Sequence, residues 1–230
     1  MLAPLAFRPW PQLLTDWLPS PPSLPPQAVL SSLATEAPGL WRDELAYAER
    51  LLRDDVRNNS AWSQRRFVLA AAPPGALQPP AEAWNEEVDW ACSRLRLAPH
   101  NEAAWAYLRG LCDGTLPGAP PRALAHEPRV LEACRRVLAT HPSCPPALAL
   151  LVDVLSEAAA LLEESAAAAD ACGAEGPDAG IGQQGGSGSN IARWLEAAGR
   201  ARADVAAALH KLVVADPLRQ AYWQQQLACT

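Results

Sequence analysis

One stretch of this chain recurs, and the recurrence limits what the chain can fold into. Residues 51–69 read LLRDDVRNNSAWSQRRFVL, and residues 95–111 read LRLAPHNEAAWAYLRGL. Each copy ends one apolar helical pattern, passes through a short polar turn and begins a second helical pattern with a tryptophan in its first turns. The matching positions lie 43 residues apart: Asn58 with Asn101, and Trp62 with Trp105.

Two further copies follow, both altered. Residues 138–151, LATHPSCPPALALL, keep the pattern with Ser143 in the asparagine place and Ala147 in the tryptophan place. Near the end of the chain, VVADPLRQAYWQQQL supplies Trp223. Units of roughly 40 residues with two helices each are typical of α-solenoids, in which a unit buries its apolar face only against its neighbours. The sequence therefore predicts an all-α fold, an α-solenoid of antiparallel helix-pair repeats of the tetratricopeptide-like kind.

The composition agrees with packed helices and argues against several functional classes. Half of the 230 residues are apolar but only 6% are aromatic, which fits helices packed through Ala and Leu better than a β-sandwich. A net charge of −6 disfavours nucleic-acid binding, which needs a basic stripe. The longest apolar run, residues 147–162, contains Asp153 and Glu157, so we expect a buried helix and no membrane span. Prolines interrupt the apolar N-terminus, unlike a secretory signal, and we expect a cytoplasmic protein.

No motif for catalysis or metal binding stands out. The six cysteines form no CxxC pair and the four histidines form neither HExxH nor HxxxH, so we expect no metal site in this chain. The adjacent pairs Glu86-Glu87 and Glu163-Glu164 have no nucleophile or histidine in pattern. We interpret both pairs as surface charge and not as acid–base carboxylates, and we assign no catalytic residue.

The composition divides the chain into four parts. Residues 1–40 are rich in proline and predict a poorly ordered extension or an atypical end cap. Residues 41–170 hold the repeats, which are separated by clusters of proline and glycine. Residues 171–189 are rich in Gly, Ser and Gln and predict a flexible insertion, whereas residues 190–230 predict a C-terminal helix pair.

Seven repeat residues are candidates for contact with a partner: Asn58, Trp62, Arg65, Arg66, Asn101, Trp105 and Tyr107. The tryptophans can instead be packing anchors between helices, and the asparagines can instead cap the helices that follow them. The two arginines can lie on a solvated face or at an interface, and the sequence leaves that choice open.

The runs WRDELAYAERLLRDDVRNNSAWSQRRFVL and LAPHNEAAWAYLRGL resemble the repeats of the α subunit shared by protein farnesyltransferase and type I protein geranylgeranyltransferase. In that family an Asn is followed four residues later by a Trp, and then by an Arg or a polar residue near the next turn. The resemblance covers about residues 41–163 and, more loosely, 190–225. The residues that meet the pattern are Asn58, Trp62 and Arg65, and then Asn101, Trp105 and Tyr107-Leu108.

The resemblance implies a crescent of helix pairs that wraps a separate β subunit. In that family the β subunit holds the zinc and the isoprenoid pocket. The heterodimer transfers farnesyl or geranylgeranyl from its diphosphate to the Cys of a C-terminal CaaX motif. Zinc, with magnesium as a second candidate, is therefore expected in the heterodimer and not in this chain, which we do not expect to be active alone.

The sequence departs from that family at its start. The family subunit has earlier repeats that lend a Lys and Tyr residues to the diphosphate, whereas here no Lys precedes an NYxxW motif and no motif copy has Tyr after its Asn. We therefore transfer no catalytic residue and expect an N-terminally truncated form. Two alternatives stay open: a helical-repeat interaction module without prenyltransferase activity, and the α subunit of Rab geranylgeranyltransferase.

Overall fold

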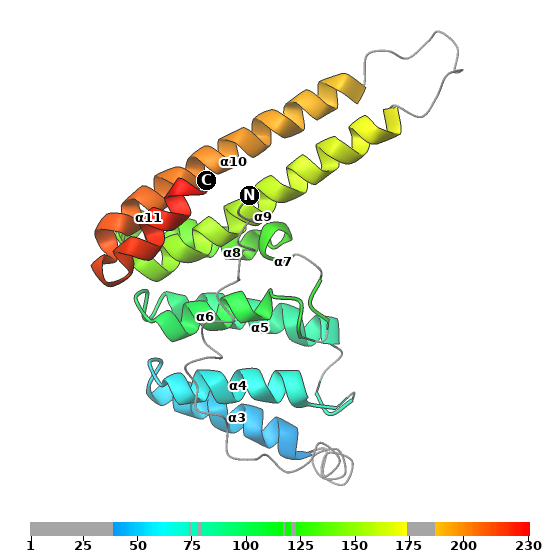
Figure 1. The fold of residues 1–230 in the computed structure, drawn as a ribbon. Helices are drawn as coiled ribbons and strands as arrows, with labels where there is room; N and C mark the ends of the chain where they lie inside the picture. The colour runs from blue at the N-terminus through cyan, green and yellow to red at the C-terminus, as the bar shows by residue number, and fades with distance from the viewer. Residues whose placement is uncertain (1–38, 74, 78–79, 117, 121–122, 174–186) are drawn as a thin grey trace, which may run out of the picture.

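The computed structural model describes residues 39–230 apart from residues 74, 78–79, 117, 121–122 and 174–186. Within that part of the chain every regular element is a helix, so the all-α prediction is confirmed. With the labels of Figure 1, the elements are α3 (Gly39–Asp54), α4 (Asn59–Ala71), α5 (Pro80–Leu95), α6 (Glu102–Leu111), α7 (Ala123–His126), α8 (Pro128–Thr140), α9 (Pro145–Gly173), α10 (Ser187–Ala215), the 3-10 turn η1 (Pro217–Arg219) and α11 (Gln220–Ala228).

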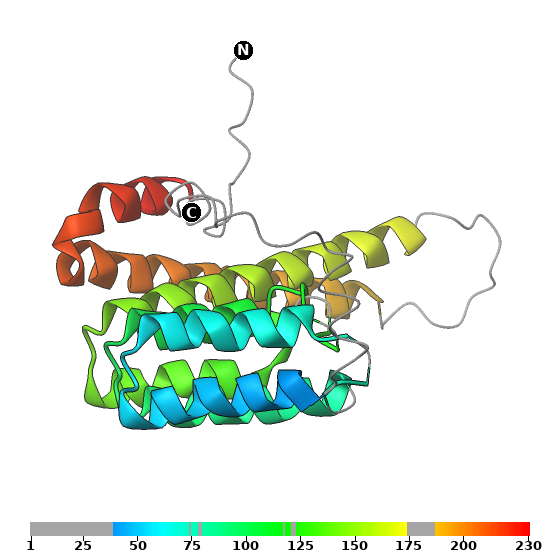
Figure 2. The same ribbon diagram turned by 90° about the horizontal axis from the view of Figure 1, so that it is seen from below.

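Consecutive helices pair antiparallel, and the pairs pile up one on the next (Figure 1). Helix α3 packs on α4, α5 on α6, and α8 on α9. Between pairs, α4 packs on α6 and α6 on α9, while α5 packs on α8. Figure 2 looks along this stack, with α3 and α4 nearest the viewer in separate rows. The predicted solenoid of helix-pair repeats is confirmed, and its units depend on one another for burial.

Local sequence signals explain where these helices begin and which face they bury. The side chain of Asn58 caps α4, because its Oδ1 accepts a hydrogen bond of 3.1 Å from the backbone N–H of Ala61. Pro128 occupies the first turn of α8, where its missing N–H costs nothing. On α5 the apolar stripe at helical spacing is buried as its periodicity predicts: Trp84, Val88, Ala91 and Leu95.

Two long helices close the stack. Helices α9 and α10 have 29 residues each, pack along one another, and extend beyond the shorter pairs (Figure 1). Arg202 on α10 forms two hydrogen bonds of 2.7 and 2.8 Å to the carboxylate of Glu163 on α9. Trp223 on α11 is buried in a separate apolar cluster with side chains from α9 and α10.

Two predicted segments fall largely outside the described residues. The extension predicted for residues 1–40 overlaps the described part only at its last two residues, where α3 begins. The insertion predicted for residues 171–189 is bordered by helix on both sides, since α9 continues to Gly173 and α10 begins at Ser187. Residues 174–186 between them lie outside the described part.

In the described part of the chain, one helix is long and apolar enough to cross a membrane by length and composition alone. The segment is Pro145–Ala171 in α9, with a mean hydropathy of 1.6 and 28% of the window buried. One such helix is weak evidence for a membrane span. Asp153 lies in the middle of the segment and forms an ion pair with Arg109 on α6, and α10 packs along its length.

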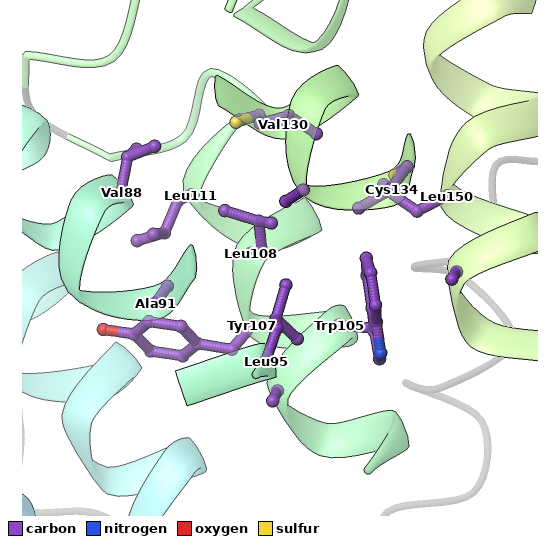
Figure 3. Close-up of a cluster of buried hydrophobic side chains, with 14 of the residues drawn as sticks. Val88, Ala91, Leu95, Trp105, Tyr107, Leu108, Leu111, Val130, Cys134 and Leu150 are labelled. Atoms are coloured by element: carbon purple, nitrogen blue, oxygen red, sulfur yellow. The ribbon is translucent and has the colours of Figure 1, made fainter. Parts of the chain in front are cut away.

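The main core lies between the stacked pairs (Figure 3). In Figure 3 the side chains of Leu108 and Leu111 point from α6 toward α5 and α8, and Val130 and Cys134 face them from α8. The side chains labelled there are fully or almost fully buried: Val88, Ala91, Leu95, Trp105, Tyr107, Leu108, Leu111, Val130, Cys134 and Leu150.

The third copy lies one residue away from the register that the sequence predicted. The backbone N–H groups of Asn58, Asn101 and Cys144 each donate to the carbonyl three residues earlier, at 3.0, 3.0 and 3.1 Å. The asparagine place is therefore held by Cys144 and not by Ser143. The same 43-residue step puts buried Leu148, and not Ala147, in the tryptophan place.

Candidate functional site

The junction of α4, α5 and α6 holds a charged cluster inside the protein. Arg65 on α4 donates two hydrogen bonds, of 2.6 and 2.7 Å, to the carboxylate of Glu87 on α5. Tyr107 on α6 donates its hydroxyl to the same carboxylate at 2.6 Å. Arg65 and Glu87 are each only 5% exposed. The bidentate geometry and the third donor satisfy both Glu87 oxygens, which a buried carboxylate requires.

Aromatic rings surround this cluster. The guanidinium carbon of Arg65 lies 3.9 Å from the ring centroid of Trp90, close enough for a cation–π interaction. The ring of Trp62 lies 5.3 Å from that of Trp90 and 4.9 Å from that of Tyr107, both tilted. We conclude that three rings exclude water from the Arg65–Glu87 ion pair, and this strengthens the attraction between the two charges.

The protonation states make the cluster a fixed set of charges. Burial opposes the charge on Arg65, but the hydrogen bonds and negative charge of Glu87 outweigh it and raise the pKa of Arg65. Burial, together with the nearby Glu87 carboxylate, raises the pKa of Tyr107 well above its usual value. Neither group exchanges a proton near neutral pH, so the cluster is suited to holding helices together and not to acid–base chemistry.

A second set of hydrogen bonds joins one repeat to the next, because donors from two repeats share one backbone carbonyl. The carbonyl oxygen of Val56 accepts hydrogen bonds of 2.8 Å from the indole N–H of Trp62 and from Nδ2 of Asn101 in the following repeat. One repeat later, Pro99 accepts from the indole of Trp105 at 2.7 Å and from the thiol of Cys144 at 3.2 Å. In each repeat, one turn carbonyl therefore accepts a hydrogen bond from the indole of its own repeat and a second one from the residue that precedes the second helix of the next repeat.

The structure separates the seven predicted site residues into two groups. Trp62, Trp105, Tyr107 and Arg65 are 2%, 3%, 4% and 5% exposed, so all four face the interior of this chain. The other three are partly accessible: Asn58, Arg66 and Asn101.

The partly accessible group also makes contacts within the chain. Asn58 caps α4, whereas Asn101 makes no capping hydrogen bond and instead links two repeats through Val56. Arg66 donates to Asp113 at 3.0 Å and to the Thr115 hydroxyl at 2.7 Å, beyond the end of α6. It reaches them across Gly110, where a Cβ would lie 2.9 Å from Nε of Arg66.

Glu87 is the residue whose role the sequence interpretation missed. The interpretation of Glu86-Glu87 as surface charge holds for Glu86, which is exposed, and is wrong for Glu87. The helical register could have revealed this, because Glu87 lies one turn after Trp84 and next to Val88 on the buried stripe of α5. A carboxylate on such a stripe requires a buried partner, and Arg65 provides it.

The described residues do not fit a zinc site. They contain no group of three or more His, Cys, Asp or Glu side chains that could hold a metal ion. Burial raises the pKa of Cys92 to about 11 and of Cys112 to about 12, and it also raises the pKa of Cys134. Zinc binds the thiolate, so a metal ion at any of these thiols would have to displace its proton.

Comparison with known proteins finds a family match for the two copies that keep both the Asn and the Trp. Residues 41–72 and 84–114 match the protein prenyltransferase alpha subunit repeat. The protein farnesyltransferase/geranylgeranyltransferase type-1 subunit alpha of Pisum sativum is 36% identical over 119 residues, which are 50% of this chain and 33% of the relative. The subunits of the same name from Dictyostelium discoideum and Arabidopsis thaliana are 40% and 42% identical over 74 residues, 22% of each relative. The match thus spans a third or less of these relatives' lengths.

Proposed function

From the premise that this chain carries protein prenyltransferase alpha subunit repeats, we propose that it serves as the non-catalytic α-type subunit of a heterodimeric protein prenyltransferase. The heterodimer would act in the cytoplasm and attach farnesyl or geranylgeranyl to the Cys of C-terminal CaaX motifs. The observation that carries the proposal is that the two matched stretches contain the copies with an intact Asn–Trp pair, at Asn58 and Asn101. The relatives named above are α subunits by name.

The chemistry of the described residues supports a scaffold role. The members of the buried Arg65–Glu87–Tyr107 cluster hydrogen-bond to one another, and the raised pKa of both Arg65 and Tyr107 keeps these two groups protonated near neutral pH. The thiols of Cys92 and Cys112 are desolvated, which raises their pKa to about 11 and about 12. In this proposal the zinc, and any magnesium, belong to the β subunit, together with the choice of isoprenoid length.

The solvent-facing side of the second helices is the surface we assign to the β subunit. Arg66 on α4 and Arg109 on α6 lie 43 residues apart and occupy equivalent positions. Both are partly accessible, and each pairs with an acidic residue from a later element, Asp113 and Asp153 respectively. A row of half-buried ion pairs along stacked helices can exchange partners when another protein docks, and it gives an interface charge-dependent specificity.

Reconstitution tests the proposal. The chain is co-expressed with a β subunit from a relative's farnesyltransferase, and transfer of radiolabelled farnesyl from its diphosphate to a CaaX peptide is measured. A peptide with Ser in place of the acceptor Cys is the matched control, since it keeps the binding motif and lacks the thiol. The proposal predicts transfer to the CaaX peptide by the pair and none by the chain alone. A pair that co-purifies without transferring farnesyl contradicts the enzymatic part.

A plain interaction module is the second candidate. The observation that favours it is the stack of helix pairs itself, in which each unit packs on the next, because such stacks present extended binding surfaces. This module would bind a protein partner without any prenyl transfer. The assay above distinguishes the two, because a co-purifying pair that leaves the CaaX peptide unmodified is the result that the module predicts. The matched relatives named above are all farnesyltransferase/geranylgeranyltransferase type-1 subunits, so the Rab-specific alternative has no observation in its favour.

A further inference from the structure

Two histidines that lie 41 residues apart in the sequence meet in the structure. His100 lies in the turn between α5 and α6, and His141 directly follows α8. The centres of their imidazole rings are 5.4 Å apart, and the ring planes cross at 83°. Both side chains are exposed. The contact is a product of the stacking, which brings the turns of two successive repeats to the same end of the molecule (Figure 1).

Hydrogen bonds fix the backbone that carries the two rings. The carbonyl of Pro99, the residue before His100, accepts a hydrogen bond of 3.2 Å from the Cys144 thiol. The carbonyl of His141 accepts one of 3.1 Å from the backbone N–H of the same cysteine. Cys144 thus joins the two turns, so the fold itself sets the spacing of the two histidines, as a preorganised binding site requires.

A hydroxyl beside His141 can hold this ring in the tautomer that binds a metal ion. Oγ1 of Thr140 donates its hydrogen to the carbonyl of Val137 at 3.1 Å. The same oxygen is then an acceptor for Nδ1–H of His141, at 2.8 Å. In this tautomer the lone pair of Nε2 is free. Metal-binding histidines are typically oriented in this way, by a hydrogen bond from the other ring nitrogen.

We propose that His100 and His141 form a binding site for a divalent late transition-metal ion, such as Ni²⁺, Cu²⁺ or Zn²⁺. Imidazole is a preferred ligand of these ions. With metal–nitrogen bonds of about 2.0–2.1 Å and tetrahedral angles, the centres of two bound imidazoles lie about 5 Å apart. The observed spacing of 5.4 Å is close to this value. Because both rings are exposed, their side chains can turn so that each aims a nitrogen at one ion.

This site differs from a closed zinc site, which takes three or four protein ligands. The described residues hold no group of three or more candidate ligands. The chain therefore supplies two ligands and water the others, so we expect an open site that exchanges its ion. The proposal depends neither on the proposed enzymatic function nor on the zinc assigned to the β subunit.

The preceding junction in the stack provides a contrast within the same chain. A step of 43 residues back from the two histidines leads to Arg57 and Ala98, and neither side chain can ligate a metal ion. The other two histidines lie elsewhere, His126 at the end of α7 and His210 on α10. We therefore assign the ion to the junction of the second and third repeats.

Isothermal titration calorimetry with nickel chloride tests the site. The protein is the full chain without an affinity tag and with Cys229→Ser, because the exposed Cys229 thiol is a competing ligand. We expect one ion to bind saturably. His100→Gln and His141→Gln should each weaken binding at least about tenfold, and combining them should add little, because one imidazole alone does not chelate. The matched controls are His126→Gln and His210→Gln, which each remove one imidazole elsewhere and should leave the affinity unchanged.

Two further measurements separate a metal site from a ring contact. Thr140→Val should weaken binding about tenfold and Thr140→Ser should restore it, since the hydroxyl orients His141. Saturating Ni²⁺ should raise the Tm of the parent chain and not that of His100→Gln, because only the folded chain brings the two rings together. Circular dichroism confirms that each variant keeps its helix content. Equal affinity for the parent and either His100→Gln or His141→Gln overturns the proposal, and so does the absence of saturable binding. A loss of binding in His126→Gln or His210→Gln assigns the ion elsewhere and overturns it too.

Discussion

Arg65 and Glu87 offer a test of what the buried ion pair contributes, because the next interface in the stack is built without one. Shifting the pair by 43 residues leads to Leu108 on α6 and Val130 on α8. Both are fully buried and face one another in the main core (Figure 3). The equivalent contact between helices is therefore compatible with two apolar side chains. The test uses three variants: Arg65→Leu, Glu87→Val and the two changes combined.

The structure sets the expected magnitudes. Either single change leaves a charge inside the protein with its partner gone, and such changes typically destabilise by about 3–5 kcal/mol. That loss is a large share of a domain's usual stability of roughly 5–15 kcal/mol. The combined change removes both desolvated charges. With Tyr107→Phe added, so that no hydroxyl is stranded, we expect a net effect between about zero and 4 kcal/mol of stabilisation.

Urea unfolding, followed by tryptophan fluorescence and by far-UV circular dichroism at pH 7, measures these free energies. Agreement between the two probes identifies a single cooperative transition. The reasoning predicts that the sum of the single effects exceeds the effect of the combined variant by several kcal/mol. Single variants that lose less than about 1 kcal/mol would refute it, since that is the range of exposed ion pairs. A combined variant as unstable as the singles would refute the analogy with Leu108 and Val130.

Two further predictions concern stability and pH. The Cβ that Gly199→Ala adds on α10 meets open space, so this change should raise the free energy of unfolding by about 0.5–1 kcal/mol. Gly110→Ala should raise it less, or lower it, because the added Cβ displaces the Arg66 side chain. Equal increases for the two variants in urea unfolding would contradict this. Burial raises the pKa of Asp153 to about 6, with Arg109 opposing, so the folded chain binds this proton more tightly than the unfolded chain. Stability should therefore decline by up to about 3 kcal/mol as pH rises from about 4 to about 6, and an Asp153→Asn variant that declines equally would contradict the assignment.

The sequence predicted the architecture because the relevant signals are local and periodic. The 43-residue step between Trp62 and Trp105, the helical stripes and the proline-rich breaks each follow from positions along the chain. They identify helices, their buried faces and their order. Burial of both indoles follows from the same periodicity.

The rest could not be predicted because it depends on which side chains meet across repeats. The helical register of α5 can place Glu87 on the buried stripe, but it does not show that Arg65, 22 residues earlier, is the side chain that reaches it. The third copy keeps neither the Asn nor the Trp, so no residue type marks its register, and the backbone hydrogen bonds confirm Cys144, 43 residues after Asn101, as the equivalent position. The shared carbonyl of Val56 has no side-chain signature at all.

The central claim is that this chain is a stacked scaffold in which the indoles of Trp62 and Trp105 pack inside the chain, and we propose that its outer surface binds another polypeptide. Sedimentation velocity of the chain mixed with a prenyltransferase β subunit tests it most directly. The account predicts a single boundary with the mass of a one-to-one complex, and the same boundary for a Trp105→Phe variant that stays folded, because that ring faces inward. Two independent boundaries at micromolar concentrations would contradict the account.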